Sequence, residues 1–173
     1  MKSISDYIPC VFIASLCALL LCYSTGRGES SLPGGCTKAV DFSLENIIDG
    51  SLFKLSDCSG KPVLMTFGSR YCKPCREMVP ELNKLHDAVK ASGVVVLKID
   101  IDSEPDRKAM KIFASEMKIN FPFLVGNREI ARQYGVIIVP TSFLVDKDKT
   151  VVKKYLGLQP CSVLENDIKA LKK

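Results

Sequence analysis

The chain of 173 residues contains no tryptophan and a single histidine, His86. Only one pair of its cysteines, Cys72 and Cys75, is spaced as CxxC, which supplies half of the ligands of a structural zinc site. His86 falls beside the apolar stripe of a predicted helix, where an ordinary, partly exposed histidine is expected. These absences argue against a zinc-binding protein, and we expect neither a metal nor another cofactor.

The chain also lacks a concentrated basic surface of the kind that binds nucleic acid. Its formal net charge is +5, and the lysines of its C-terminal part lie in two segments without an interleaved aromatic pattern. They are typical of a solvated surface rather than of one that binds nucleic acid or anionic lipid. These lysines are Lys147, Lys149, Lys153, Lys154, Lys169, Lys172 and Lys173.

Charged residues are absent from positions 7–23, which are mostly apolar. Such a segment is typical of an export signal, and it is near the lower limit of the about 20 residues that cross a membrane. We predict that residues 1–28 are a signal peptide, cleaved after Gly26 or Gly28, or an N-terminal membrane anchor. A lipid anchor at Cys22 is a weaker alternative. The protein would then be exported to the periplasm or the outer face of the cytoplasmic membrane, with membrane contact only through this segment.

A stretch with several glycines and a proline follows and predicts a linker, which argues against a buried first helix. We assign residues 29–38 to this linker and residues 39–173 to one folded domain. Export agrees with the cysteine content, because an oxidising compartment lets disulfides persist. Cys10, Cys17 and Cys22 lie in the apolar segment. After it, three cysteines lie outside the CxxC, namely Cys36, Cys58 and Cys161, so at most one bridge forms among them and the pairing stays open.

Apolar periodicity in this domain predicts an α/β fold with a mixed central sheet flanked by helices. A turn at Asp49-Gly50 predicts an N-terminal β-hairpin, and continuous apolar runs predict central strands buried on both faces. The middle strands should be parallel and the late hairpin antiparallel. The predicted strands are residues 39–44, 51–55, 62–67, 94–99, 121–125, 141–145 and 151–156, and the predicted helices start near residues 76, 103, 128 and 160, with Ser103 as a cap.

The run Tyr71-Cys72-Lys73-Pro74-Cys75 lies between a predicted buried strand and a predicted helix. Thiols at this spacing can close a disulfide within one helical turn, and the helix N-terminus stabilises the thiolate of the first cysteine. We predict that Cys72 is the nucleophile and Cys75 the more buried, resolving thiol of a redox disulfide. Tyr71, Lys73 and Pro74 are the expected active-site neighbours.

Two arginines, Arg70 and Arg76, and the lysine between them lie close to Cys72 in sequence and could lower its pKa further. Exchange also needs a surface that accepts an extended polypeptide. We predict that Val139 and Pro140 form it, because a cis proline before a strand would leave backbone groups free to pair with a substrate strand. An ordinary trans proline at a strand start is the alternative.

The following segments carry a resemblance to a known family: Asp41-Phe42-Ser43-Leu44, Leu55-Ser56-Asp57, Gly60-Lys61-Pro62-Val63-Leu64, Cys72-Lys73-Pro74-Cys75-Arg76, Pro80-Glu81-Leu82, Tyr134-Gly135-Val136 and Val139-Pro140-Thr141-Ser142-Phe143-Leu144-Val145-Asp146. The chain resembles the TlpA/ResA-type, exported thiol–disulfide oxidoreductases of the thioredoxin fold over about residues 39–173. The resemblance implies a central helical insertion at residues 104–120, a reversible Cys72–Cys75 disulfide and a helix-kinking Pro80.

Three residues depart from the family pattern. Tyr71 stands where most members carry tryptophan, Thr66 where plain thioredoxins have a buried acid, and Met78 where ResA-like members often have glutamate. Glu77 is adjacent to Met78 but should point elsewhere on the helix. Neither usual proton acceptor for Cys75 is in place, which leaves the rate and direction of exchange open.

Other members of the fold suggest rival functions. Copper-delivery proteins generally have a histidine in the second half of the sheet, and none follows His86. Ser69 lies three residues before Cys72, as in peroxidases of this fold, but Met65 stands where those proteins would have a proline. A redox-inactive binding or scaffold domain, in which Cys72–Cys75 is a static structural bridge, is the main alternative.

We therefore expect an exported thiol–disulfide oxidoreductase that exchanges electrons with cysteine pairs of other exported proteins. The resemblance implies reduction in c-type cytochrome maturation, or envelope redox homeostasis, as possible roles. A protein that works as a reductant outside the cytoplasm also needs an electron donor, for which a membrane thiol carrier is the expected partner.

Overall fold

The computed structural model describes residues 37–103 and 106–171. The predicted signal or anchor at residues 1–28, most of the linker and Cys36 lie outside the described residues. None of the helices in the described ranges is both long and apolar enough to cross a membrane.

The domain begins with a small antiparallel hairpin of β1 (Ser43–Glu45) and β2 (Leu52–Lys54), followed by the 3-10 helix η1 (Leu55–Cys58). The predicted strand at residues 39–44 is therefore shorter and later than expected. Its first residues run alongside the turn before β7, where Ala39 donates a backbone hydrogen bond to Lys149.

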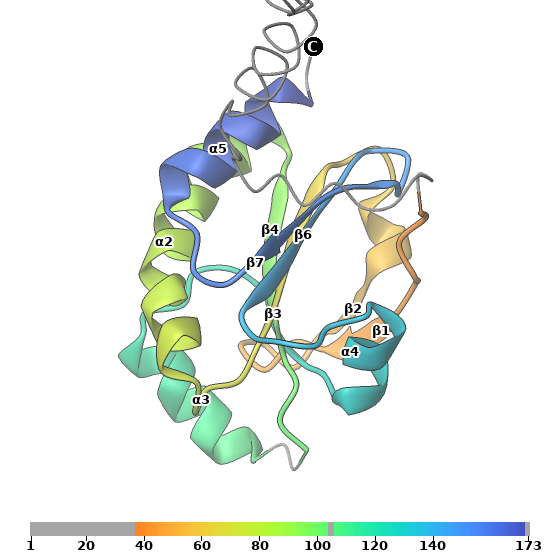
Figure 1. Cartoon of the computed structure of the whole chain (residues 1–173). Helices are drawn as coiled ribbons and strands as arrows, with labels where there is room; N and C mark the ends of the chain where they lie inside the picture. The colour runs from red at the N-terminus through yellow and green to blue at the C-terminus, as the bar shows by residue number, and fades with distance from the viewer. Residues whose placement is uncertain (1–36, 104–105, 172–173) are drawn as a thin grey trace, which may run out of the picture. The chain divides into compact units, whose positions relative to one another are not determined.

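The central sheet has five strands in the order β5-β4-β3-β6-β7 (Figure 1). Its strands are β3 (Val63–Gly68), β4 (Val95–Asp100), β5 (Phe123–Val125), β6 (Thr141–Val145) and β7 (Val151–Leu156). Strands β3, β4 and β5 are parallel neighbours, whereas β6 and β7 join on the other side of β3 as an antiparallel pair. The mixed sheet predicted from the apolar pattern is thus confirmed, and β3 at its centre leads directly into the CxxC.

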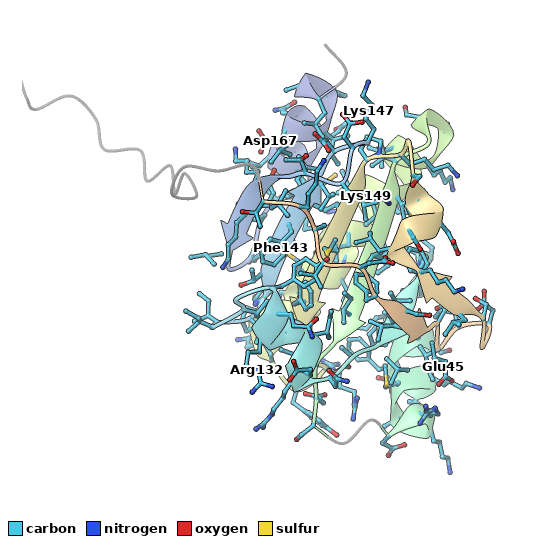
Figure 2. All side chains as sticks on the ribbon, turned by 90° about the vertical axis from the view of Figure 1, so that its right-hand side faces the viewer. Glu45, Arg132, Phe143, Lys147, Lys149 and Asp167 are labelled. Carbon is cyan, nitrogen blue, oxygen red and sulfur yellow. A yellow bond between two sulfur atoms is a disulfide. The ribbon has the colours of Figure 1, made fainter. Side chains whose placement is uncertain are left out.

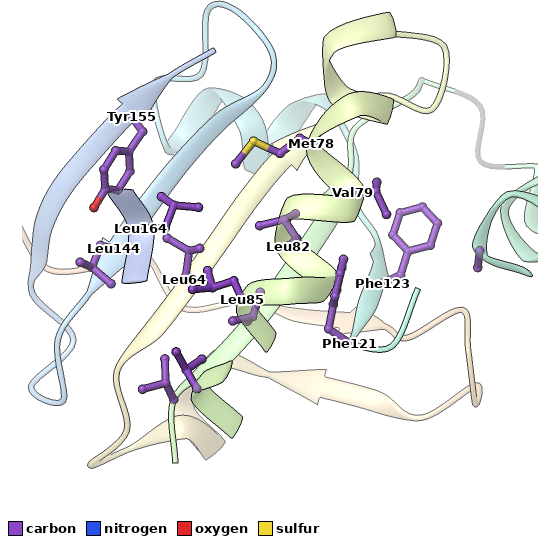
Figure 3. Close-up of a cluster of buried hydrophobic side chains, with 14 of the residues drawn as sticks. Leu64, Met78, Val79, Leu82, Leu85, Phe121, Phe123, Leu144, Tyr155 and Leu164 are labelled. Carbon is purple, nitrogen blue, oxygen red and sulfur yellow. The ribbon is translucent and has the colours of Figure 1, made fainter. Parts of the chain in front are cut away.

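Helices cover both faces of this sheet. On one face lie α2 (Lys73–Val89), α3 (Arg107–Glu116) and α5 (Cys161–Ala170), with α2 and α5 side by side (Figure 1). Their apolar stripes pack on the sheet in one cluster that includes Leu64 and Leu82 (Figure 3). The opposite face is covered by α4 (Arg128–Gln133), η1 and the hairpin.

The cluster on this second face contains several aromatic rings. Phe143 of β6 packs against Phe67 of β3 and against Tyr134, which follows α4. Figure 2, which views this side of the domain, labels Phe143 at the centre of the side chains. Both faces of β3 are therefore buried, as its continuous apolar run predicted.

Two helix starts differ from the predictions. Helix α2 begins at Lys73 rather than near residue 76, because Cys72 itself is the N-cap and Pro74 suits the first turn, where N–H groups lack helical partners. Helix α3 is capped by Asp106, whose side chain accepts a hydrogen bond from Ala109 N–H at 3.0 Å. The cap predicted at Ser103 was wrong because an aspartate caps as well as a serine and apolar spacing does not choose between them.

Candidate active site at the start of helix α2

The two CxxC sulfurs form a disulfide at the N-terminus of α2, with 5.2 Å between the Cα atoms of Cys72 and Cys75. Cys72 lies before the first helical residue, and its Sγ accepts a hydrogen bond from Cys75 N–H at 3.3 Å. Its side chain is half-buried, whereas Cys75 is only 1% exposed. A partner can therefore reach the first sulfur, while the second lies behind it among core residues.

The side chains that flank the disulfide in sequence face solvent. Tyr71 is 75% exposed, and Pro74 is exposed on the first turn of α2. The Lys73 ammonium is exposed and lies 3.9 Å from the Glu77 carboxylate. The predicted neighbours thus surround Cys72 on its solvent side, where an incoming protein would meet them.

Residues Val139 and Pro140 come from the segment before β6 and lie beside the disulfide. The Val139–Pro140 peptide bond is cis, as predicted. The Val139 carbonyl oxygen is 3.7 Å from Cys72 Sγ. Just before Val139 in sequence, Ile137 is 93% exposed and Ile138 about half exposed, so two apolar side chains face solvent next to the residue that contacts Cys72 Sγ.

Arg70 does not turn towards Cys72. Its side chain is 4% exposed, and its Nη1 lies 3.3 Å from carboxylate oxygens of both Asp100 and Asp102. Its Nη2 donates to the Tyr71 hydroxyl at 3.3 Å, and its guanidinium lies over that ring, 4.9 Å from the centroid. Because two carboxylates balance its charge, Arg70 anchors Tyr71 rather than supplying an unbalanced cation to the thiol.

Two positions that usually hold an acid in related proteins hold Thr66 and Met78 in this chain, and both side chains are buried. The Thr66 hydroxyl shares a hydrogen bond of 2.8 Å with Ser142 on the neighbouring strand. Met78 is 1% exposed, and its sulfur accepts a hydrogen bond from Gln159 N–H at 3.4 Å. Glu77 is half exposed, as expected, on the outer side of α2.

Lys98 of β4 was not predicted as a site residue; it is 1% exposed, and its Cε faces the same space at Gly68 as Cys75 Sγ. Its Nζ is 4.6 Å from the Phe123 ring centroid and 5.8 Å from that of Phe113. Burial lowers the pKa of Lys98 to about 8. The signal that could have revealed it is a lysine inside a predicted buried strand, because lysine is almost never fully buried without a partner.

The other cysteines in the described residues stand apart from this site. Cys58, the last residue of η1, is buried in the core, and Cys161 is partly exposed at the start of α5; both are free thiols. Burial raises the pKa of each thiol. Within the described ranges, no group of three or more His, Cys, Asp or Glu side chains could hold a metal ion.

Comparisons with known proteins agree with this geometry. A model of the AhpC/TSA family matches residues 36–154. The thiol-disulfide oxidoreductase ResA of Bacillus thuringiensis subsp. konkukian is 37% identical over 125 residues, which are 72% of this chain and 71% of that protein. The thioredoxin-like protein YneN of Bacillus subtilis is 29% identical over 131 residues, 76% of each chain.

Solved structures of other proteins have folds similar to that of this chain. A crystal structure from Chlorobium tepidum, assigned to the thiol:disulfide interchange protein DsbE, has a TM-score of 0.72 and 33% identity. The match covers 83% of this chain and all of that one. With a thioredoxin-like fold, a CxxC disulfide at a helix start and these relatives, the chain belongs to the AhpC/TSA family and is a ResA-like thiol–disulfide oxidoreductase.

Proposed function

We propose that this oxidoreductase works outside the cytoplasm on cysteine pairs of other exported proteins, with Cys72 as the attacking thiol and Cys75 as the resolving thiol. The observation that carries this assignment is the difference between the two sulfurs. The half-buried Sγ of Cys72 borders solvent at the helix N-terminus, and Cys75 is 1% exposed one turn further in. The apolar segment at residues 7–23 supports export.

In the reducing direction the chemistry runs in two exchanges. The Cys72 thiolate attacks one sulfur of a partner's disulfide, forming a mixed disulfide and releasing the partner's other sulfur as a thiolate. The Cys75 thiolate then attacks Cys72 Sγ, forming the Cys72–Cys75 bond and expelling the partner's second sulfur. The partner gains two electrons, and the protein is oxidised. The oxidising direction is the reverse of these steps.

The helix start supports the first exchange. Unpaired N–H groups and the dipole at the N-terminus of α2 favour negative charge on Cys72, and Cys75 N–H already points at its sulfur. The backbone at Val139 lies next to that sulfur, where an extended segment of the partner could pair with it. Ile137 and Ile138 offer an apolar contact for the same segment.

Reduction of disulfides in c-type cytochrome maturation is one proposed role, and general redox homeostasis of the cell envelope is another. Either reducing role requires an electron donor, for which we propose a thiol carrier in the membrane. The reduction potential of the full chain, equilibrated with glutathione or dithiothreitol, decides the direction. A value near about −270 mV would mark a reductant and a value near about −120 mV a disulfide donor.

The same titration tests the alternative of a static, structural bridge. A Cys72–Cys75 disulfide that resists reduction well below about −300 mV would contradict a redox role. An exposed, labile bridge is reduced in the range of the redox enzymes, and the accessible Cys72 favours this result.

Substitution of the two cysteines tests their separate roles. We expect Cys72→Ser to abolish exchange and Cys75→Ser to trap mixed disulfides with partners, which diagonal electrophoresis and mass mapping in cells would detect. Cys161→Ser is the matched control, since this free thiol lies on α5 and should leave exchange unchanged. If Cys75→Ser accumulated no adducts, Cys75 would not be the resolving thiol.

A further inference from the structure

Cys75 must lose a proton before it can resolve a mixed disulfide. An unperturbed thiol has a pKa of about 8.5, and burial raises it because the charged form is disfavoured in an apolar site. Cys75 is 1% exposed, so its thiolate needs help near neutral pH. Thr66 and Met78 stand where related proteins place acids, and neither side chain can accept a proton near neutral pH.

Lys98 lies beside Cys75 because Gly68 has no side chain between them. A Cβ built on Gly68 would lie 3.3 Å from Cys75 Sγ and 3.6 Å from Lys98 Cε. Cys75 Sγ and Lys98 Cε therefore face the same space over Gly68, the last residue of β3. In the described part of the chain, Lys98 Nζ has no hydrogen-bond partner, although it is buried.

The groups around Lys98 make its ammonium easy to deprotonate. The pKa of Lys98 is lowered to about 8, chiefly by burial; Asp100 and Asp102 oppose this shift, and Arg70 adds a smaller lowering. The helices packed against it present the Phe113 ring from α3 and Cys75 from α2, and Arg76 stacks on the same Phe113 ring. The amine can therefore be neutral or charged near neutral pH.

Asp100 is the other buried group that could accept a proton here. It is 2% exposed, but both its oxygens are engaged. Oδ2 accepts from Arg70 Nη1 at 3.3 Å, and Oδ1 accepts from Asp102 N–H at 3.1 Å. Lys98 Nζ has no hydrogen-bond partner in the described residues, and its Cε faces the same space at Gly68 as Cys75 Sγ, so the geometry favours the amine.

We propose that Lys98 is the proton acceptor of Cys75, an inference that rests on the proposed resolving role of that thiol. The neutral Lys98 amine takes the thiol proton, directly or through one water, and becomes an ammonium. The Cys75 thiolate then attacks Cys72 Sγ, the new S–S bond forms, and the partner leaves as a thiolate that takes up a proton. In the reverse direction the Lys98 ammonium protonates Cys75 as it leaves.

The test follows both exchanges in the purified, reduced, full-length protein in detergent. Glutathione disulfide is added, the reaction is quenched with acid, and mass mapping follows two species over a range of pH. The Cys72–glutathione adduct reports the first exchange, and the Cys72–Cys75 disulfide reports closure by Cys75. Peptide mapping distinguishes these two species from products that form at the other cysteines.

In Lys98→Met we expect adduct formation to change less than about twofold and closure near neutral pH to slow at least about tenfold. The deficit should shrink as the pH rises towards about 10, because Cys75 then ionises without help. The control Lys154→Met removes a lysine that also lies over an aromatic ring, that of Phe143, but on the opposite face of the sheet, where its ammonium donates a hydrogen bond to the Gly135 carbonyl. It should close at the wild-type rate.

Several results would overturn the proposal. Closure by Lys98→Met at the wild-type rate would remove the need for the amine, and an equal deficit at every pH would mean that Lys98 only supports packing. If the variant does not fold by circular dichroism, the wild-type profile decides: closure should level off near about pH 8, and a rate that climbs to about pH 10 would refute the proposal. A wild-type protein that forms the adduct but never closes would instead refute the resolving role of Cys75.

Discussion

Replacing Arg70 with methionine removes the guanidinium from a buried charge cluster, and we expect a large loss of stability. Arg70 is 4% exposed and bridges Asp100, which is 2% exposed, and Asp102. Methionine keeps much of the aliphatic volume but leaves the buried Asp100 carboxylate without its cation. Removing one partner of a buried ion pair costs about 3–5 kcal/mol. Because Lys98 can supply part of the missing charge, we expect about 3 kcal/mol, near the lower end of that range.

The loss should depend on pH in a defined direction. Burial raises the pKa of Asp100 in the folded protein, and removal of Arg70 would raise it further. A carboxyl whose folded pKa lies above its unfolded value of about 3.9 destabilises the fold above that value, and the penalty falls as the carboxyl takes up a proton. The difference between Arg70→Met and wild type should therefore be smaller at about pH 5 than at about pH 7.

Urea unfolding of the oxidised protein at these two pH values measures the effect. A loss of about 3 kcal/mol also corresponds to a fall of about 6–12 °C in the melting temperature for a domain of this size. Arg132→Met is the matched control: this arginine is exposed on α4, where it pairs with Glu129, and should cost less than about 0.5 kcal/mol (Figure 2). A loss below about 1 kcal/mol for Arg70→Met, or one that grows in acid, would refute the account of the cluster.

Two further changes test other parts of the structure. In Gly126→Ala the new Cβ would lie 2.7 Å from the backbone carbonyl oxygen of Asp100, which already accepts a hydrogen bond from Gly126 N–H. We therefore expect the free energy of unfolding in urea to fall by about 3 kcal/mol. An unchanged free energy would contradict this close approach. Burial, with a smaller contribution from Lys90, lowers the pKa of His86 in the folded protein. Stability should therefore fall as the pH drops below the unfolded value of about 6.5, and His86→Gln should remove that part of the acid sensitivity; melting temperatures that fall equally in both proteins would contradict it.

The elements that could be predicted from sequence are those whose signals are local. The apolar run of β3, the helical spacing after the CxxC and the polar turn between β6 and β7 each specify an element without knowledge of its neighbours. The starts of α2 and α3 were predicted wrongly: Cys72 is not one of the usual capping residues, and both Ser103 and Asp106 satisfy the capping rule. The disulfide and the cis bond at Pro140 followed from motifs and the family resemblance.

The inner side of the site could not be predicted because it depends on how strands align. Lys98 lies opposite Thr66, and Asp100 lies opposite Gly68, in the parallel pairing of β3 and β4. A shift of this register by one residue would turn Lys98 to the other face of the sheet, away from Cys75. Arg70 was misjudged for the same reason, since its partners Asp100 and Asp102 are close in space and distant in sequence.

The three departures from the family pattern have separate structural partners. The hydroxyl of Tyr71 accepts a hydrogen bond from Arg70, Thr66 pairs with Ser142, and the Met78 sulfur accepts from Gln159. None of these side chains offers a proton acceptor to Cys75, but the buried Lys98 side chain faces the same space over Gly68 as the Cys75 sulfur. If Lys98 carries the proton, closure should become faster as its ammonium loses a proton and should level off near about pH 8.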